Sequence, residues 1–372
     1  MVMQIEPSDY DIATSATPEE VVKIFPRTET IGAQFGVILV IYQGHAFEVA
    51  TFRSDDAYVD GRRPTGVTFT DAKQDVLRRD FTINGLLYDP MEDRVIDYVN
   101  GRADIEARLV RAIGDPFARF EEDKLRILRA VRFGARLGYR IEPATWDAVV
   151  QMAPSIHQVS SERIREELVR ILTEGQAAAG IRMLEQSGLR REILPDVEWN
   201  GHIERSLEML QRGAQADFAM AVLLHEAPTR QVEGIIERLK FSRAEIHHVL
   251  ALVENLPNFY KVRKMSLSQI KRFFRLFRFE DHLELARIHG TAAGEDLADY
   301  SYASRTYQGW TPQDIAPRPL ISGEDLIVLG FSPGPRFKEI LTRLEDEQLE
   351  GRIVDRPQAV DFVIRHYGET KS

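Results

Sequence analysis

The sequence predicts an α+β protein, in which a small N-terminal α/β head is followed by an all-helical region. Two observations support this fold class. In the N-terminal part, short runs of β-branched residues are separated by turn sequences, which is the pattern of short strands. Beyond Pro116, apolar residues recur at helical spacing almost to the end of the chain, which is the pattern of amphipathic helices.

The head is expected to open with a helix and to continue with a hairpin. Residues Thr17-Pro18-Glu19-Glu20 match a capping box with proline at the first helical position, so we expect a short helix that ends near Phe25. The runs 35–42 and 47–52 are rich in β-branched and aromatic residues, and Gln43-Gly44-His45 between them is a turn sequence. These two runs are therefore predicted to be the strands of a hairpin.

Further along the chain, a strand is expected at 94–99, and Ser160-Ser161-Glu162 is expected to begin a helix. The character of the sequence changes near residue 116 and, less sharply, near residue 200. We therefore predict three domains, which span residues 1–115, 116–200 and 201–372.

Composition restricts the classes of protein to which the chain can belong. Its 372 residues are 44% hydrophobic and 28% charged, which is enough for two or three globular domains. The sequence contains no cysteine, which excludes disulfides, a zinc–thiolate site and a thiol nucleophile. Its apolar stretches are too short to span a bilayer, and its first residues do not resemble a secretion signal. We expect a cytoplasmic location and no membrane partner.

Carboxylates near the N-terminus are candidate metal ligands. Asp9 and Asp11 are two residues apart in a segment that is expected to be extended, so their side chains point to the same face. Such a pair can bind Mg²⁺, although D-x-D also occurs by chance in many surface loops. Glu48 lies in an otherwise apolar strand and offers a third carboxylate; an exposed edge position is the alternative interpretation.

Two arginine-rich segments are candidate nucleotide contacts. Arg78-Arg79-Asp80 is followed by Asn84, and arginine forks match phosphate oxygens; without context, a structural ion pair at a helix start is favoured. Residues 119–133 are expected to be one helix in which an acid and three arginines recur every third residue, namely Asp123, Arg126, Arg129 and Arg132. Asp and Arg can together read a base edge, whereas an ordinary amphipathic helix is the alternative.

In combination and in this order, the motifs identify a family. DYDIAT, FGV, EVATFR, DGRRP, VTFT, RRDFTIN, VIDYVNGRADI, IGDP, RFEEDKLRILRAVRF and SSERIREEL closely resemble the bacterial tRNA nucleotidyltransferase and poly(A) polymerase family, in the class II branch of the polymerase-β superfamily. The resemblance is dense over about residues 7–175 and thinner beyond. It implies a nucleotidyltransferase head (1–115), a neck with base-recognition helices (116–200), and a tRNA-binding body and tail (201–372).

The resemblance also implies roles for the candidate residues. Asp9 and Asp11 would hold two Mg²⁺ ions about 3.5–4 Å apart, and Glu48 would support them. The residues implied to bind the incoming CTP or ATP are Arg79, Asp80 and Asn84 for its phosphates and sugar, Asp123 and Arg126 for its base, and Arg129 and Arg132 as further contacts. The expected reaction is attack of an RNA 3′-hydroxyl, on tRNA or another RNA, on the α-phosphate of the nucleotide.

The sequence departs from the family pattern at its N-terminus. Family members carry a glycine-rich G-G-x-V-R-D segment upstream of D-x-D, whereas the residues before Asp9 contain no glycine. We therefore expect a head that is short at its N-terminus. The resemblance implies addition of the CCA end to tRNA, and a poly(A) polymerase of the same family is the next alternative, since the motifs do not separate the two. The missing glycine-rich segment adds a catalytically impaired RNA-binding relative, and an HD-type phosphohydrolase is the fourth interpretation. The last depends on His225 alone, which we expect to be an ordinary helix residue.

A basic stretch is the candidate RNA-binding surface. The net charge of −10 argues mildly against a nucleic-acid partner, but it does not describe local patches. Seven basic residues and no acidic one lie between residues 261 and 278, and a solvated helix face is the alternative. We expect tRNA phosphates to contact Lys261, Arg263, Lys264, Lys271, Arg272 and Arg275. The sequence leaves the oligomeric state open.

Overall fold

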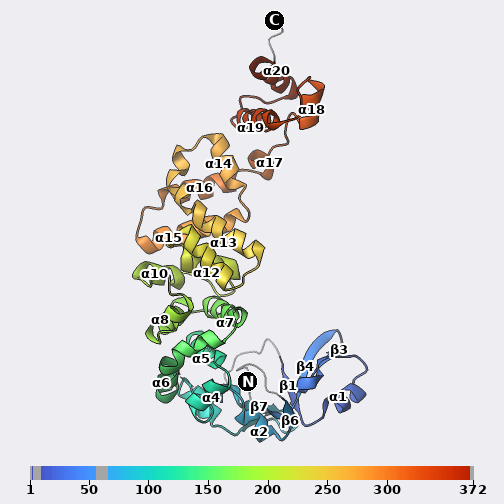
Figure 1. Ribbon diagram of the computed structural model, residues 1–372, viewed down its shortest axis with the longest axis vertical. Coiled ribbons are helices and arrows are strands. Elements are labelled where there is room, and N and C mark those ends of the chain that lie inside the picture. The colour runs from blue at the N-terminus through green and yellow to red at the C-terminus, as the bar shows by residue number, and fades with distance from the viewer. Residues whose placement is uncertain (1, 3–9, 56–65, 369–372) are drawn as a thin grey trace. The chain divides into compact units, whose positions relative to one another are not determined.

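The computed structural model describes residues 2, 10–55 and 66–368 (Figure 1). They divide into two compact units. The first comprises Met1–Met220 and Arg230–Ile246, and the second comprises Ala221–Thr229 and His247–Ser372. Small sheets occur in the N-terminal part, and helices make up the remainder. This arrangement confirms the predicted α+β class.

A four-stranded sheet forms the first part of the head, in the order β1-β4-β3-β2 (Figure 1). Its strands are β1 (Ile12–Thr14), β2 (Thr28–Gly32), β3 (Val37–Tyr42) and β4 (His45–Thr51). The edge strand β1 pairs with β4 in parallel, and the other pairs are antiparallel. Gln43 and Gly44 have positive φ angles of 49° and 83°, as a tight two-residue hairpin turn requires. The predicted hairpin is thereby confirmed.

Helix α1 (Pro18–Ile24) packs on this sheet and begins as the sequence predicts. The Thr17 amide donates to the Glu20 carboxylate at 2.8 Å, and the Glu20 amide donates to the Thr17 hydroxyl at 3.4 Å. This reciprocal capping satisfies two amides that would otherwise lack a partner. The small core beneath the helix is apolar and contains Val21, Ile38, Val40 and Val49.

The rest of the head consists of short strand pairs and helices. Strand β5 (Arg53–Asp55) pairs with β6 (Val67–Phe69), and β7 (Leu86–Asp89) pairs with β8 (Arg94–Asp97). The strand predicted at 94–99 ends at Asp97, because that carboxylate accepts hydrogen bonds from the amides of Val99, Gly101 and Arg102. The remaining elements are α2 (Ala72–Leu77), η2 (Thr82–Asn84), α3 (Gly101–Glu106) and β9 (Leu109–Val110), which pairs with β10 (Arg140–Ile141).

The single helix expected at 119–133 is wrong. The chain forms α4 (Pro116–Glu122) and α5 (Leu125–Leu137), which are separated by an extended Asp123 with φ −145° and ψ 105°. The Asp123 carboxylate accepts a hydrogen bond of 3.0 Å from the amide of Leu125, the first residue of the second helix, whose N-cap residue is Lys124. Asp123 therefore does not share a helix face with the arginines that follow it.

Further helices follow α5 in the first unit, and three of them, which span 143–152, 161–173 and 177–186, pack against it. Leu125, Leu128 and Val131 on α5 are buried, as expected for the inward face of an amphipathic helix. Residue Ser161 begins a helix, as predicted. These helices are α6 (Pro143–Met152), α7 (Ser161–Thr173), α8 (Ala177–Gln186), α9 (Leu189–Ile193), α10 (Gly201–Glu208) and α12 (Thr229–Arg238), and α11 (Ala216–Leu224) contains the boundary between the units.

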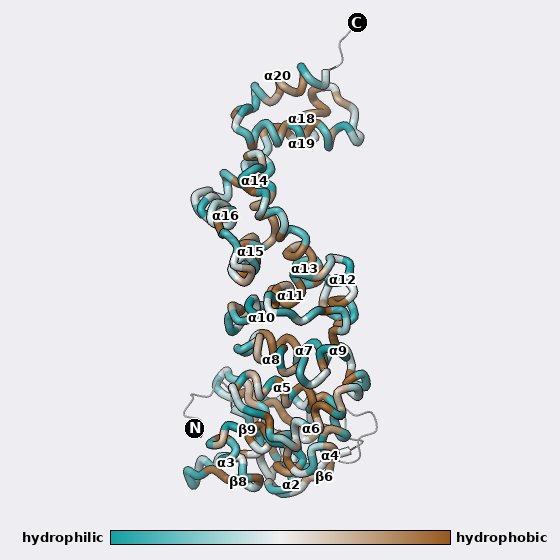
Figure 2. The backbone as a smooth tube through the Cα atoms, turned by 90° about the vertical axis from the view of Figure 1, so that its left-hand side faces the viewer, coloured by the Kyte–Doolittle hydropathy of each residue, from teal (hydrophilic) through white to brown (hydrophobic). Residues whose placement is uncertain are grey.

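The second unit is entirely helical in its described part. Helix α13 (Arg243–Asn255) contains a further boundary between the units. The helices after it are η4 (Leu256–Lys264), α14 (Leu267–Phe274), α15 (Phe279–Ala293), α16 (Ala298–Gly309), α17 (Pro312–Ile315), α18 (Gly323–Val328), α19 (Pro335–Leu349) and α20 (Arg356–Tyr367). Figure 2 shows apolar and polar residues interspersed along these helices. Aromatic rings of Phe259, Phe273, Phe274, Phe279 and Tyr307 pack against one another inside the unit. No helix in the described ranges has the length and apolar character needed to cross a bilayer.

Candidate nucleotide- and metal-binding site

Two of the three predicted metal ligands can be located: Asp11 directly precedes strand β1, and Glu48 lies on the neighbouring strand β4. The parallel pairing of β1 with β4 begins at Ile12 and Val49, so Asp11 and Glu48 immediately precede the first pair. Residues at the same level of a parallel pair present their side chains on the same face of the sheet. Both side chains are exposed. Asp9 lies outside the described residues.

The alternative interpretation of Glu48 as an edge residue is wrong. Strand β4 lies between β1 and β3, so Glu48 is exposed on a face of the sheet. Its neighbour Val49 points to the opposite face and is only 5% exposed. Carboxylate oxygens that are exposed side by side are the donors that Mg²⁺ prefers. Asp11 and Glu48 therefore fit a divalent cation.

Arg78 and Arg79, at the end of α2, are held by one buried carboxylate that the sequence analysis did not identify. Asp75 is 3% exposed and forms salt bridges of 2.7 Å with Arg78 and 3.1 Å with Arg79. Arg79 also donates a hydrogen bond of 3.0 Å to the carbonyl oxygen of Asn84. The spacing of three and four residues on a helix is the signal that could have indicated Asp75.

Asp80 lies at the centre of a second buried network. Its carboxylate accepts hydrogen bonds of 2.8 Å from the Phe81 amide, 3.0 Å from the Asn84 side chain and 2.7 Å from Arg129. Burial acts to raise the pKa of Asp80, but the charge of Arg129 and these hydrogen bonds outweigh it, so the pKa is lowered. The structural ion pair that was the alternative interpretation is therefore present, and nucleotide contacts of Asp80 and Asn84 stay predictions.

The predicted base-reading pair lies at the break between α4 and α5. Arg126 is 8% exposed; it donates hydrogen bonds of 2.7 Å to Glu122 and 3.0 Å to the carbonyl of Arg78. Asp123 forms a salt bridge of 2.8 Å with Arg163 of α7. Each side chain is thus fixed by a partner of opposite charge. Arg163 was not identified from the sequence, because it lies on a separate helix.

Arg129 and Arg132 lie on α5, and both approach Glu167 of α7. Arg132 is 4% exposed and forms salt bridges of 3.0 Å with Glu167 and 3.7 Å with Glu174. Burial lowers the pKa of Arg132 and raises that of Glu167. The surroundings of Arg132 favour a structural role, and its contact with a nucleotide stays a prediction.

The second half of the basic stretch is neutralised by α19. Arg272 and Arg275 form salt bridges of 2.6 and 2.5 Å with Glu345, and Lys271 donates a hydrogen bond of 3.1 Å to the carbonyl oxygen of Leu349. The sequence contains no acid between residues 261 and 278, but the fold supplies acids from elsewhere in the chain. These three residues are therefore poorer candidates for RNA contacts than the sequence predicts.

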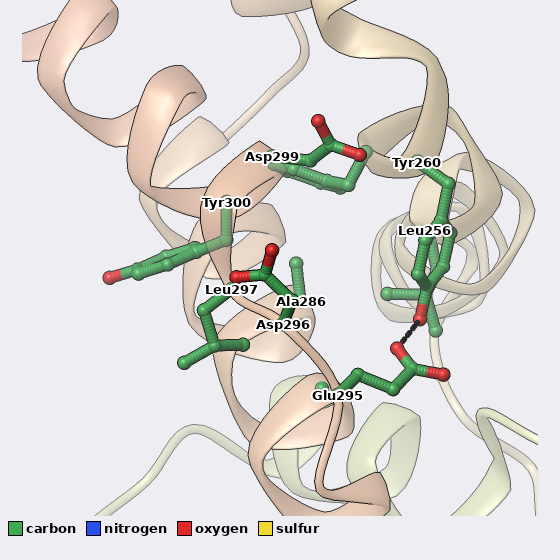
Figure 3. A pocket seen from close by; sticks show the side chains of 10 residues that line it. Leu256, Tyr260, Ala286, Glu295, Asp296, Leu297, Asp299 and Tyr300 are labelled. Carbon is green, nitrogen blue, oxygen red and sulfur yellow. Dashed lines mark hydrogen bonds between the residues drawn. The ribbon is translucent and has the colours of Figure 1, made fainter.

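The first half of the basic stretch lies on η4 beside a shallow pocket of the second unit. Tyr260 and the acids Glu295, Asp296 and Asp299 line this pocket (Figure 3). Tyr260 donates a hydrogen bond of 2.6 Å to Glu295, and its pKa is raised by burial and by this bond. Arg263 forms an ion pair with Asp299.

Lys261 and Lys264 differ from the other basic residues of the stretch. Both side chains are exposed, and within the described part of the chain neither forms a hydrogen bond or an ion pair. They are the best-placed candidates for RNA contacts. His225, the basis of the phosphohydrolase alternative, lies in the turn after α11 and not within the helix, with its Nδ1 atom 2.7 Å from the carbonyl oxygen of Val222.

Comparisons with known proteins identify the relatives of the chain. Family profiles match a poly A polymerase head domain at residues 1–111, an RNA and SrmB-binding site of polymerase A at 138–200, and tRNA nucleotidyltransferase domain 2 at 211–363. The chain is 32% identical to a CCA-adding enzyme of Levilactobacillus brevis over 95% of its own length and 87% of that protein. It is 33% identical to a CCA-adding enzyme of Streptococcus mutans, with 95% and 88% coverage.

Solved structures show the same fold. The Bacillus stearothermophilus CCA-adding enzyme in complex with CTP superposes with a TM-score of 0.80 at 27% identity, with coverage of 98% of this chain and 90% of that one. The Thermotoga maritima CCA-adding enzyme complexed with tRNA has a TM-score of 0.66 at 20% identity, with coverage of 98% and 88%. Because it is more than 30% identical to CCA-adding enzymes over nearly its whole length, the chain belongs to the tRNA nucleotidyltransferase and poly(A) polymerase family.

Proposed function

We propose that the protein adds CMP and AMP to the 3′ end of tRNA and so builds or repairs its CCA terminus. The observation that carries this proposal is the placement of Asp11 and Glu48 side by side on one face of the head sheet, in a chain related over nearly its whole length to CCA-adding enzymes. We infer a cytoplasmic location from tRNA as the proposed substrate.

Asp11 and Glu48, together with Asp9, would hold two Mg²⁺ ions, which when bound activate the attacking hydroxyl and stabilise the leaving pyrophosphate. In the reaction, the terminal 3′-oxygen of the RNA bonds to the α-phosphorus of CTP or ATP, and the bond from that phosphorus to the bridging oxygen breaks. The hydroxyl loses its proton, and pyrophosphate leaves with the electron pair of the broken bond.

The residues of the chain position the nucleotide for this step. Arg79 retains N–H groups beyond those bonded to Asp75 and Asn84, and guanidinium forks suit phosphate oxygens. Asp123 offers acceptors and Arg126 offers donors, which together can match the Watson–Crick edge of cytosine or adenine. The salt bridges to Arg163 and Glu122 hold these two groups in fixed orientations.

The test is an extension assay of the chain with labelled tRNA that lacks its 3′ end, with CTP and ATP supplied separately and together. Addition of C, C and A in the presence of Mg²⁺, with loss of activity in EDTA, is the expected result. Asp11→Asn is the matched inactive control, since it removes a charge but keeps the size of the side chain. We expect its rate to fall about a thousandfold, roughly 4 kcal/mol of transition-state stabilisation.

A poly(A) polymerase is the second candidate, because the head matches a poly A polymerase head domain. The same assay with a generic RNA and ATP alone distinguishes the two: a long adenylate tail would favour polymerase activity. Binding of tRNA without any extension would instead indicate a catalytically impaired RNA-binding protein.

A further inference from the structure

We propose that Asp75 is a positioning residue, which fixes the phosphate-binding Arg79 relative to the sheet that carries Asp11 and Glu48. This inference rests on the function proposed above and deepens it. Asp75 itself is not expected to touch the nucleotide, because its side chain is enclosed by protein groups and is 3% exposed.

One carboxylate orients two guanidinium groups. Its Oδ2 atom accepts hydrogen bonds from Nε and Nη2 of Arg79, at 3.4 and 3.1 Å. Its Oδ1 atom accepts from Nε and Nη2 of Arg78, at 3.0 and 2.7 Å. Paired N–H donors on one charged acceptor set the plane of each guanidinium as well as its position. Asp75 thus determines where both arginines of the motif point.

The same carboxylate is bonded to the strand that follows the metal-binding strand. Its Oδ1 atom accepts a hydrogen bond of 3.3 Å from the amide of Arg53, and Nε of Arg78 donates one of 2.9 Å to the carbonyl oxygen of Arg53. Arg53 begins β5, and only Phe52 separates it from the end of β4, which carries Glu48. Asp75 therefore fixes the position of Arg79 relative to the strand that carries Glu48.

Arg79 keeps a free edge in this arrangement. A guanidinium has five N–H groups, and Arg79 makes hydrogen bonds from Nε and Nη2 to Asp75 and from Nη1 to the carbonyl of Asn84. Two N–H groups stay available for phosphate oxygens, on a side chain that is 30% exposed. Burial acts to raise the pKa of Asp75, but the charges of the two arginines and their hydrogen bonds lower it overall, so the carboxylate stays ionised at neutral pH.

A positioning role and a merely structural role predict different kinetics. The triphosphate is common to CTP and ATP, so a misplaced Arg79 weakens the binding of both nucleotides equally and leaves tRNA binding unchanged. A change in base recognition would alter the KM values for CTP and ATP by different factors. A loss of folded protein would lower kcat per mole of chain and leave the KM values unchanged.

The experiment compares steady-state kinetics of the wild-type chain with Asp75→Asn, Arg79→Ala and the double variant. We expect Asp75→Asn to raise the KM for CTP and for ATP by about tenfold each, as expected for the loss of charged hydrogen bonds. The KM for tRNA should stay within twofold. In the Arg79→Ala background, Asp75→Asn should cause no further rise, because its effect acts through that arginine.

Glu185→Gln is the matched control, because Glu185 also pairs with a buried arginine, Arg190, but touches none of the proposed nucleotide contacts. It should leave both nucleotide KM values unchanged. Unequal KM changes, an unchanged KM, or additive effects of Asp75→Asn and Arg79→Ala would overturn the inference.

Two further measurements cover the cases in which Asp75→Asn does not fold or the wild-type chain does not extend tRNA. If Asp75→Asn does not fold, Arg79→Ala alone must raise both nucleotide KM values, and an unchanged KM rejects the inference. If the wild-type chain does not extend tRNA, the dissociation constants of CTP and ATP replace the KM values. Nucleotide binding that depends on Asp75 through Arg79 would then support the inference although the proposed function fails. Absence of nucleotide binding to the wild type rejects both.

Discussion

Arg129 of α5 and Asp80 of the head form a salt bridge of 2.6 Å. The Asp80 side chain is 8% exposed and that of Arg129 is 29% exposed, so the pair is largely shielded from solvent. It connects α5, which also carries Arg126, to the segment that directly follows Arg79. The salt bridge therefore joins two segments that carry predicted nucleotide contacts.

Loss of this salt bridge should destabilise the first unit. Asp80→Asn removes the charge that compensates Arg129, and we expect a loss of about 2 kcal/mol in unfolding free energy, below the 3–5 kcal/mol typical of a fully buried pair, because Arg129 is partly exposed. Chemical denaturation measures this loss. The double variant Asp80→Asn with Arg129→Met should lose less than the sum of the single variants; simple additivity would show that the two residues are not coupled.

Base selection should depend on the carboxylate of Asp123. Asp123→Asn replaces one acceptor by a donor and weakens the salt bridge to Arg163, so the preference between CTP and ATP should change about tenfold or more. The ratio of the two kcat/KM values is the measurement. The control is Glu121→Gln, because Glu121 lies next to the proposed site but forms its salt bridge with Lys124. An equal fall for both nucleotides after Asp123→Asn would contradict a base-reading role.

Binding of tRNA should depend on Lys261 and Lys264, the two exposed lysines of η4. Reversing both charges, in Lys261→Glu with Lys264→Glu, should weaken tRNA affinity and lower the salt dependence of binding by about one unit for each phosphate that is no longer neutralised. Filter binding at several salt concentrations measures both effects. Lys23→Glu, at an exposed lysine of α1, reverses one charge, as each of the single variants Lys261→Glu and Lys264→Glu does. If it weakened binding as strongly as either single variant, the effect would be one of net charge.

The second unit should lose stability in mild acid because of His282. This residue of α15 is 1% exposed, neither ring nitrogen has a hydrogen-bond partner in the described structure, and the burial of the ring together with the nearby His248 lowers its pKa from 6.5 to about 4. Other charged groups in contact with His248 or its neighbours are Asp281, 3.5 Å from His248, and Arg278, which pairs with Asp281.

Between pH 6.5 and 4, the unfolded chain binds a proton at this histidine that the folded chain does not. Stability is therefore expected to fall as the pH drops below 6.5, by about 3 kcal/mol once the pH is below 4. Thermal unfolding at pH 7.5 and 5.0 tests this. His282→Phe should unfold with a smaller difference in Tm between the two pH values, and an unchanged difference would assign the acid sensitivity to other groups.

Local patterns in the sequence predicted the elements of the head well. The capping box at Thr17 and the hairpin were correct, because both depend on residues that are neighbours along the chain. The metal-binding roles of Asp11 and Glu48, which the family resemblance implies, stay predictions, although the pairing of β1 with β4 brings their segments together. The break at Asp123 was missed, because apolar spacing continues through it and only the hydrogen bond to Leu125 stops the helix.

Partners that are distant in sequence could not be predicted. Glu345 lies 70 residues after Arg275, and no periodicity links the two. The sequence therefore did not indicate that Arg272 and Arg275 are paired with an acid, and their contacts with RNA stay predictions. Asp75 was accessible to sequence reasoning through its helical spacing from Arg78 and Arg79, but its bond to Arg53 depends on the fold of the head.

The packing of α14 on α19 has a consequence for shortened forms of the protein. Glu345 and Asp346 act as built-in counterions for Arg272 and Arg275. A fragment that ends before Pro335 would expose these arginines and Lys271 as a dense polycation, which attracts any polyanion regardless of its shape. The C-terminal helices would thus prevent non-specific binding of polyanions, because their acids neutralise these basic residues.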